Sequence, residues 1–282
     1  MTRRSLLRLS ALVVACAPFA LSPLPARAQD WAKASLEKSP RHREYVTIKA
    51  GSRSVNTFVV YPETSQKVPV IVLIHEIFGL SDWAKGMADE LAAQGYLVLA
   101  PDLLSGTGPA AGGGKAGGGT DSYSGMDAIT KAVSGLPSDQ VLSDLDAVAS
   151  YGLKLPAANG KLAVTGFCWG GGKTFAFATH RKDLSGAYVF YGPPPETSAL
   201  AGIATPVYGF YAGNDARIDA TIPGTVEAMK AAGKSYDPQT YAGAGHGFMR
   251  AGEAPDASPE NRIAREEAFK RMTSLLKPLQ TN

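Results

Sequence analysis

The chain has 282 residues, of which 45% are hydrophobic and 19% are charged, with 28 Lys and Arg against 25 Asp and Glu. This composition excludes a disordered or fibrous protein, and the chain is long enough to bury a sizeable core. The formal net charge is only +3 and no basic stripe is present, which argues against a nucleic-acid partner.

The first 28 residues differ from the rest of the chain. They contain the pair Arg3-Arg4, an apolar run and a small-residue site at Ala28, which is typical of an export leader cleaved before Gln29. The two arginines indicate the twin-arginine route, so we expect a periplasmic or secreted protein with no stable membrane association after cleavage. Lipoprotein processing at Cys16 is the alternative. The leader carries the excess positive charge, since 24 basic and 25 acidic residues follow it.

Residues 29–282 are predicted to form a single α/β domain, because no shift in composition marks a second one. The stretch 43–49 alternates polar and apolar residues, and 55–61 follows it after a glycine turn; together they predict two antiparallel strands that open the sheet. The stretch 68–74 is apolar throughout, as expected of a central strand buried on both faces. The sheet should therefore begin antiparallel and continue in parallel.

The remaining chain alternates helical and strand patterns, each bounded by glycine, proline or capping residues. Helices are predicted at 83–93, 138–153, 173–178, 222–232 and 259–279, and strands at 96–100, 161–164, 184–191, 206–212 and 235–241. Strands separated by helices imply right-handed parallel crossovers. The predicted fold is a mostly parallel central sheet with antiparallel N-terminal strands and helices on both faces.

One loop is unlike the rest of the chain. Nine glycines lie between Gly106 and Gly125, so the backbone there is expected to be mobile or shaped by contacts made elsewhere. Two interpretations stay open for this loop: an exposed flexible insertion, and a lid or rim over a site.

The stretch Gly166-Phe167-Cys168-Trp169-Gly170 joins an apolar strand to a helical segment. It matches the G-x-nucleophile-x-G turn, which normally carries serine, so the predicted nucleophile here is the thiol of Cys168. The N-terminus of the following helix should favour the thiolate. The alternative is a small buried hydrophobic residue. Without the leader no second cysteine remains, so no intramolecular disulfide is expected.

Two further residues complete a possible triad. Asp215 and His246 each follow a predicted parallel strand, as Cys168 does, and open α/β sheets bind their ligands at this edge. The order nucleophile, acid, histidine is that of the α/β-hydrolase fold. The alternatives are a turn residue for Asp215 and a surface loop residue for His246. We expect His75 only to support its loop, and His42 and His180 to lie elsewhere.

With these motifs in place, the sequence resembles the dienelactone hydrolase (carboxymethylenebutenolidase) family. The resemblance covers most of the mature chain and rests on the stretches 75–79, 101–103, 166–171, 213–215 and 245–250. It implies that Glu76 contacts the resting thiol and helps to form the thiolate. It also places the oxyanion hole at the backbone N–H groups of Ile77 and Trp169, and assigns Arg250 to a substrate carboxylate.

Alternatives and departures accompany these assignments. Glu76 could instead be a partly buried acid paired with an arginine, and Arg250 a solvated loop charge. A second carboxylate-binding arginine is absent, because the chain has none from position 54 to 180; Lys115 or Lys131 is the possible substitute.

The sequence therefore predicts a hydrolase that opens lactones or small activated esters through a cysteine thioester. It is expected to use no cofactor or metal and to be a monomer, with a small-molecule substrate that can carry a carboxylate. The alternative is a noncatalytic small-molecule binding protein on the same scaffold.

Overall fold

The computed structural model describes residues 30–109 and 118–281. The predicted leader, its cleavage site and Cys16 lie outside these residues, as does the middle of the glycine-rich loop, so these predictions are not tested. Within the two described ranges, no helix has the length and apolar character needed to cross a bilayer.

Eight strands form one sheet in the spatial order β1-β2-β4-β3-β5-β6-β7-β8. The pairs β1–β2 and β2–β4 are antiparallel and all others are parallel, as the sequence predicted. The strands are β1 (Arg43–Ala50), β2 (Arg53–Val60), β3 (Val68–Ile74), β4 (Leu97–Pro101), β5 (Ala158–Phe167), β6 (Gly186–Phe190), β7 (Val207–Ala212) and β8 (Tyr236–Tyr241).

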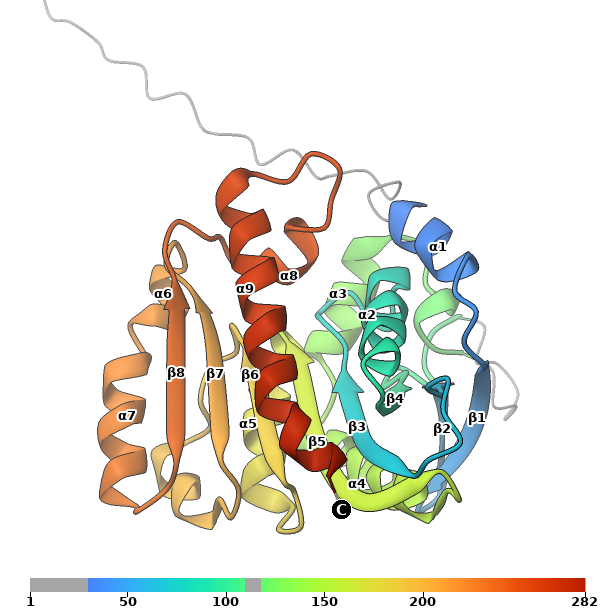
Figure 1. Ribbon diagram of the computed structural model, residues 1–282, viewed down its shortest axis with the longest axis horizontal. Coiled ribbons are helices and arrows are strands. Elements are labelled where there is room, and N and C mark those ends of the chain that lie inside the picture. The colour runs from blue at the N-terminus through green and yellow to red at the C-terminus, as the bar shows by residue number, and fades with distance from the viewer. Residues whose placement is uncertain (1–29, 110–117, 282) are drawn as a thin grey trace, which may run out of the picture.

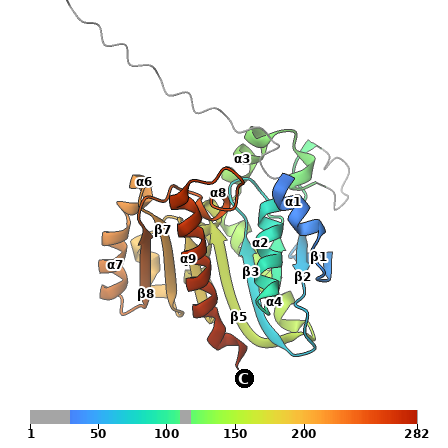
Figure 2. The same ribbon diagram turned by 45° about the horizontal axis from the view of Figure 1, so that its top comes forward.

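Two layers of helices cover this sheet (Figure 1, and turned by 45° in Figure 2). One face packs against α1 (Asp30–Glu37), α2 (Asp82–Ala93), α8 (Phe248–Ala251) and α9 (Pro259–Leu276), and the other against α4 (Ser138–Lys154), α5 (Trp169–His180) and α7 (Ile222–Ala231). Both faces of β3 are buried: Ile71 and Leu73 join the first core, whereas Val70, Val72 and Ile74 join the second. This explains why the strand is apolar throughout.

The remaining helical elements are short or were not predicted. They are α3 (Met126–Ser134), α6 (Ala216–Asp219) and three 3₁₀ turns at Thr120–Ser122, Thr197–Gly202 and Lys277–Gln280. The sequence reading also missed α1 and α8, and it ended the last helix too late. Four-residue α6 and α8 are too short to show a 3.6-residue periodicity. Predicted strand and helix positions otherwise agree with the structure to within a few residues.

An ion-pair network joins α2, α9 and the segment after α8. The Arg265 guanidinium donates to Glu253 Oε1 at 2.9 Å and to the Glu90 carboxylate, and lies 4.9 Å from the ring centre of Phe269. Burial raises the pKa of Glu253 to about 7, and the negative charge of Glu90 acts in the same direction, against the effect of Arg265. The segment after α8 is thus tied to α2 and α9 by one guanidinium that is shared between two carboxylates.

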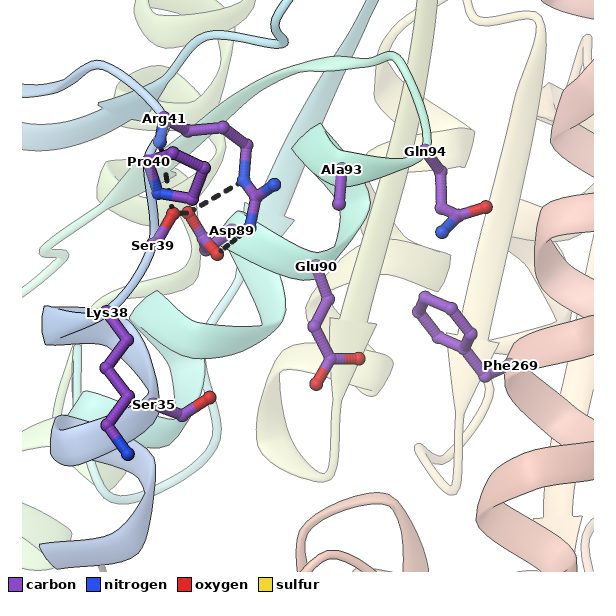
Figure 3. A pocket seen from close by; sticks show the side chains of 10 residues that line it. All are labelled: Ser35, Lys38, Ser39, Pro40, Arg41, Asp89, Glu90, Ala93, Gln94 and Phe269. Carbon is purple, nitrogen blue, oxygen red and sulfur yellow. Dashed lines mark hydrogen bonds and ion pairs between the residues drawn. The ribbon is translucent and has the colours of Figure 1, made fainter.

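Glu90 also borders a surface hollow. Figure 3 shows Glu90 and Phe269 on one side of it, with Arg41 bound to Asp89 on the other. The bond from Arg41 Nε to Asp89 Oδ1 measures 3.0 Å. Arg41 pairs with Asp89, and Glu90 pairs with Arg265, so these side chains already have partners of opposite charge. The hollow is a surface crevice between α1, α2 and α9.

The network predicts a pH-dependent stability. Protonated Glu253 is favoured in the folded state, so its contribution to stability is complete below the ordinary carboxyl pKa and is lost as the pH rises through about 7. Glu253→Gln cannot ionise and keeps an oxygen for Arg265. We expect its melting temperature to exceed that of the wild type by about 2–5 °C at pH 8 and to match it near pH 4.5, measured by circular dichroism. The exposed Glu227→Gln on α7 is the control; an unchanged pH dependence in Glu253→Gln would contradict the prediction.

Candidate active site

Cys168 occupies a tight turn between β5 and α5. Its backbone has φ 57° and ψ −117°, a conformation that L residues rarely adopt. The flanking glycines make the turn possible: a Cβ on Gly166 would lie 2.3 Å from the Gly170 carbonyl oxygen, and one on Gly170 would lie 2.4 Å from the His75 carbonyl oxygen. The predicted nucleophile turn is therefore present at this position.

Asp215 and His246 come together with Cys168 at the carboxyl ends of the parallel strands, the upper edge of the sheet in Figure 1. His246 Nε2 lies 3.1 Å from Cys168 Sγ, and His246 Nδ1 lies 2.5 Å from Asp215 Oδ2. The Asp215 carboxylate is buried, whereas about a third of the His246 side chain is exposed. This arrangement allows the imidazole to accept the thiol proton while the carboxylate fixes its orientation.

Glu76 and Arg250 form a buried ion pair beside the thiol. Glu76 is 2% exposed, and its Oε2 accepts a bond of 2.8 Å from Arg250 Nε. The guanidinium also lies 4.9 Å from the ring centre of Phe78. The Glu76 carboxylate thus accepts a hydrogen bond from an arginine, which agrees with the alternative of an acid paired with an arginine. Because it is part of this pair, Arg250 is not a solvated loop charge.

The pKa of the resting Cys168 thiol differs from the expectation that the helix N-terminus would favour the thiolate. Burial, together with the nearby charge of Glu76, raises the pKa of Cys168 to about 11. The backbone N–H groups of Trp169 and Ile77 lie close enough to the sulfur to lower its pKa, which opposes this change. The helix N-terminus therefore does act as the sequence suggested, but burial and a neighbouring carboxylate outweigh it. The cysteine is held as a neutral thiol.

The same two N–H groups are those predicted for the oxyanion hole. Trp169 N–H begins α5 directly after the nucleophile, and Ile77 N–H belongs to the loop that follows β3. Both lie close to the sulfur, where the oxygen of an attacked carbonyl group would become negatively charged. The structure brings them together from two strands that are neighbours in the sheet.

The other histidines lie apart from the triad. His180 Nε2 contacts Asp146 at 2.7 Å on the α4–α5 side, and the His42 ring packs beside Tyr61. His75 is fully buried beneath the loop that contains Glu76, as expected.

The described ends of the glycine-rich loop are anchored near the site. Thr120 N donates to Asp102 Oδ2 at 2.7 Å, and Thr120 Oγ1 accepts from Leu80 N at 2.9 Å. Gly119 has φ 130°, and a Cβ on it would lie 2.5 Å from Asp102 Oδ2. Thr120 therefore links the buried Asp102 to Leu80 in the loop that carries Glu76, while residues 110–117 lie outside the description.

Two residues near the sulfur were missed by the sequence reading. Arg217, exposed on α6 two residues after Asp215, lies close enough for its charge to lower the pKa of Cys168. The ring of Tyr191, directly after β6, packs in a T-shaped arrangement with that of His246, with 5.1 Å between ring centres. Arg217 could have been found from its position two residues after Asp215 in the sequence. For Tyr191, the only signal was its position at the end of a predicted strand.

The donor set does not favour a metal site. Across residues 30–109 and 118–281, no group of three or more His, Cys, Asp or Glu side chains is placed to hold a metal ion. Cys168 is the one free cysteine in these ranges.

The sheet order, the nucleophile turn and the order of the contacting residues define an α/β-hydrolase fold. The model of the dienelactone hydrolase family matches residues 55–280, and the chain belongs to that family.

Individual relatives agree with this assignment. A Methylorubrum extorquens protein, provisionally named carboxymethylenebutenolidase, is 33% identical over 66% of this chain and 65% of its own. A Yersinia pestis protein with the same provisional name is 30% identical over 76% of this chain and 81% of its own. The crystal structure of a provisional dienelactone hydrolase from Klebsiella pneumoniae superposes with a TM-score of 0.71 at 25% identity, covering 84% of this chain and 98% of that one.

The electrostatics of the thiol can be tested directly. Because the charge of Glu76 raises the pKa of Cys168, Glu76→Gln should lower it and leave Arg250 unpaired nearby, which acts in the same direction. A fall of one pKa unit gives about tenfold more thiolate below the pKa. We expect faster alkylation by iodoacetamide at pH 8 and a lower midpoint in its pH profile. Glu227→Gln is the control, and an unchanged or slower alkylation of Glu76→Gln would contradict this account.

Proposed function

We propose that this protein hydrolyses lactones or small activated esters through a thioester on Cys168. The observation that carries the proposal is the continuous chain of contacts from Cys168 Sγ to His246, 3.1 Å, and from His246 to Asp215, 2.5 Å. Membership of a hydrolase family gives the reaction class. The carboxylate–imidazole–thiol chain gives the means of activating the sulfur.

In the proposed reaction, His246 Nε2 takes the thiol proton as Cys168 Sγ attacks the substrate carbonyl carbon. The carbonyl oxygen becomes an oxyanion that accepts hydrogen bonds from the N–H groups of Ile77 and Trp169. Collapse of this intermediate breaks the bond to the leaving oxygen, which receives the proton from His246, and a thioester remains. Water, deprotonated by the same imidazole, then attacks the thioester, and the carboxylic acid is released with the thiol restored.

The nucleophile limits the substrates. A thiolate is a better leaving group than an alkoxide or an amide nitrogen, so the tetrahedral intermediate returns to reactants unless the oxygen that departs is stabilised. Enol lactones and aryl esters meet this condition and amides do not. A neutral resting thiol adds a further restriction, because the proton must leave Cys168 as the substrate binds or reacts. Glu76, which the family resemblance connects with thiolate formation, is next to the sulfur for that step.

The competing proposal is a binding protein without turnover, and one substitution separates the two. Cys168→Ala should lower hydrolysis of p-nitrophenyl acetate by at least about 10³-fold, since removing a nucleophile abolishes the covalent route. Stopped-flow spectroscopy of the wild type should also give a burst of p-nitrophenolate equal to the concentration of enzyme. A wild-type rate no faster than that of Cys168→Ala would support binding only.

We also infer that the substrate carries a carboxylate on the side of α6. Arg250 is only partly exposed and already donates its Nε to the buried Glu76 carboxylate, and removing one partner of a buried pair costs about 3–5 kcal/mol. Arg217 is exposed, has no ion-pair partner within the described ranges, and influences the charge of the Cys168 sulfur. Of the lysines considered as substitutes, Lys131 is exposed on α3 and Lys115 lies outside the description. Arg217 is therefore the cation available to an incoming anion.

This inference predicts a charge-dependent loss. Arg217→Ala should lower kcat/KM for mono-p-nitrophenyl glutarate about 3–10-fold and that for neutral p-nitrophenyl acetate less than about twofold, and the difference should shrink at 0.5 M salt. Lys230→Ala is the control, because this exposed lysine ends α7 at the opposite edge of the sheet, where β8 begins. Equal losses on both esters would exclude a role in recognising charge.

A further inference from the structure

His75 lies where the loops behind both oxyanion donors meet. The residue follows β3 directly, is fully buried, and its Nδ1 lies 2.7 Å from the Glu76 carbonyl oxygen. Its ring stacks on that of Trp169, with 5.6 Å between ring centres and an angle of 11° between the planes. Among the described residues, Nε2 has no hydrogen-bond partner, so the bond to Glu76 and the stack fix the ring.

The protonation of this ring follows from its partner. A carbonyl oxygen can only accept, so Nδ1 must carry a hydrogen and donate it. Burial lowers the pKa of His75, which keeps the ring neutral, with its single hydrogen on Nδ1. The imidazole is thus a fixed neutral donor rather than a second base for the thiol.

The hydrogen bond between His75 and the Glu76 carbonyl group also orients the Ile77 N–H, which belongs to the same peptide group. The Glu76 carbonyl and the Ile77 N–H belong to the same planar unit, in which C=O and N–H point in opposite directions. No cis peptide bond occurs in the described residues. Holding the carbonyl end therefore determines where the N–H end points, and that N–H lies close enough to Cys168 Sγ to lower the pKa of the thiol. A donor on the carbonyl also polarises the peptide and strengthens its N–H as a donor.

The second contact concerns the other donor. Trp169 supplies the N–H that follows the nucleophile, and its indole rests on the His75 ring. The backbone is equally close, since a Cβ on Gly170 would lie 2.4 Å from the His75 carbonyl oxygen. One imidazole thus braces the start of α5 and the loop after β3 together.

We propose that His75 is a positioning residue for the oxyanion hole: its Nδ1–H aims the Ile77 N–H, and its ring seats Trp169. This inference rests on the proposed function, because an oxyanion forms only if Cys168 attacks a carbonyl. A histidine that merely fills space would make the same apolar contacts, but it would not influence one reaction of the sulfur more than another.

Two substitutions separate the hydrogen bond from the stack. His75→Phe keeps an aromatic ring against Trp169 and removes the donor, whereas His75→Asn keeps an amide N–H near the position of Nδ1 and removes the ring. The readouts are the acylation rate constant with p-nitrophenyl acetate and the rate of alkylation by iodoacetamide at the same pH. Alkylation forms an S–C bond by expelling iodide and creates no oxyanion, so it reports on the thiol alone.

We expect His75→Phe to lower acylation about 10–100-fold, less than the full loss of one oxyanion donor, while alkylation stays within about threefold of the wild type. His75→Asn should retain acylation to within about fivefold. Wild-type acylation by His75→Phe, or equal losses of acylation and alkylation, would overturn the proposal.

Folding and the proposed function are checked in parallel. Near-ultraviolet circular dichroism and melting temperature report on folding, and His75→Leu replaces His75→Phe in the same comparison if the latter is unfolded. Hydrolysis by Cys168→Ala at the wild-type rate would refute the thioester mechanism itself. An inactive Cys168→Ala together with a fully active His75→Phe would refute the role of His75 alone.

Discussion

The constraint on which the site depends is a cysteine held in left-handed backbone between a strand and a helix. Such a conformation costs on the order of 1–3 kcal/mol. It persists because β5 is buried within the sheet and α5 is packed against it. The absence of side chains at Gly166 and Gly170 lets the helix approach the strand ends closely. The result is a sulfur that stands at the edge of the sheet, facing an imidazole on one side and two N–H groups on the other.

Around this sulfur, opposing electrostatic effects are resolved in favour of the neutral thiol. Two backbone N–H groups favour the thiolate, but burial and the charge of Glu76 exceed them. Glu76 cannot easily leave, because Arg250 pairs with it in a site where either charge alone would be costly. In the proposed mechanism, the N–H groups of Ile77 and Trp169 are thus in place before negative charge develops on the substrate oxygen.

The sequence was informative where function depends on local pattern. The apolar β3, the order Cys168, Asp215, His246, and the glycines around the turn predicted the sheet edge and the contacts found there. Pairing of Glu76 with Arg250 could be raised only as an alternative, because 174 residues separate them and burial decides the outcome. The positions of Arg217 and Tyr191 depend on how chain segments pack, for which a single sequence has no periodic signal.

The residues of the site follow four different strands: β3, β5, β7 and β8. During synthesis, the sulfur consequently leaves the ribosome well before His246, which comes after the last strand of the sheet. The nascent polypeptide carries a thiol that has no base to activate it. In the proposed mechanism, the thiol can attack an ester only after β8 has joined the sheet and brought His246 to Cys168, so completion of the fold is a precondition of the chemistry.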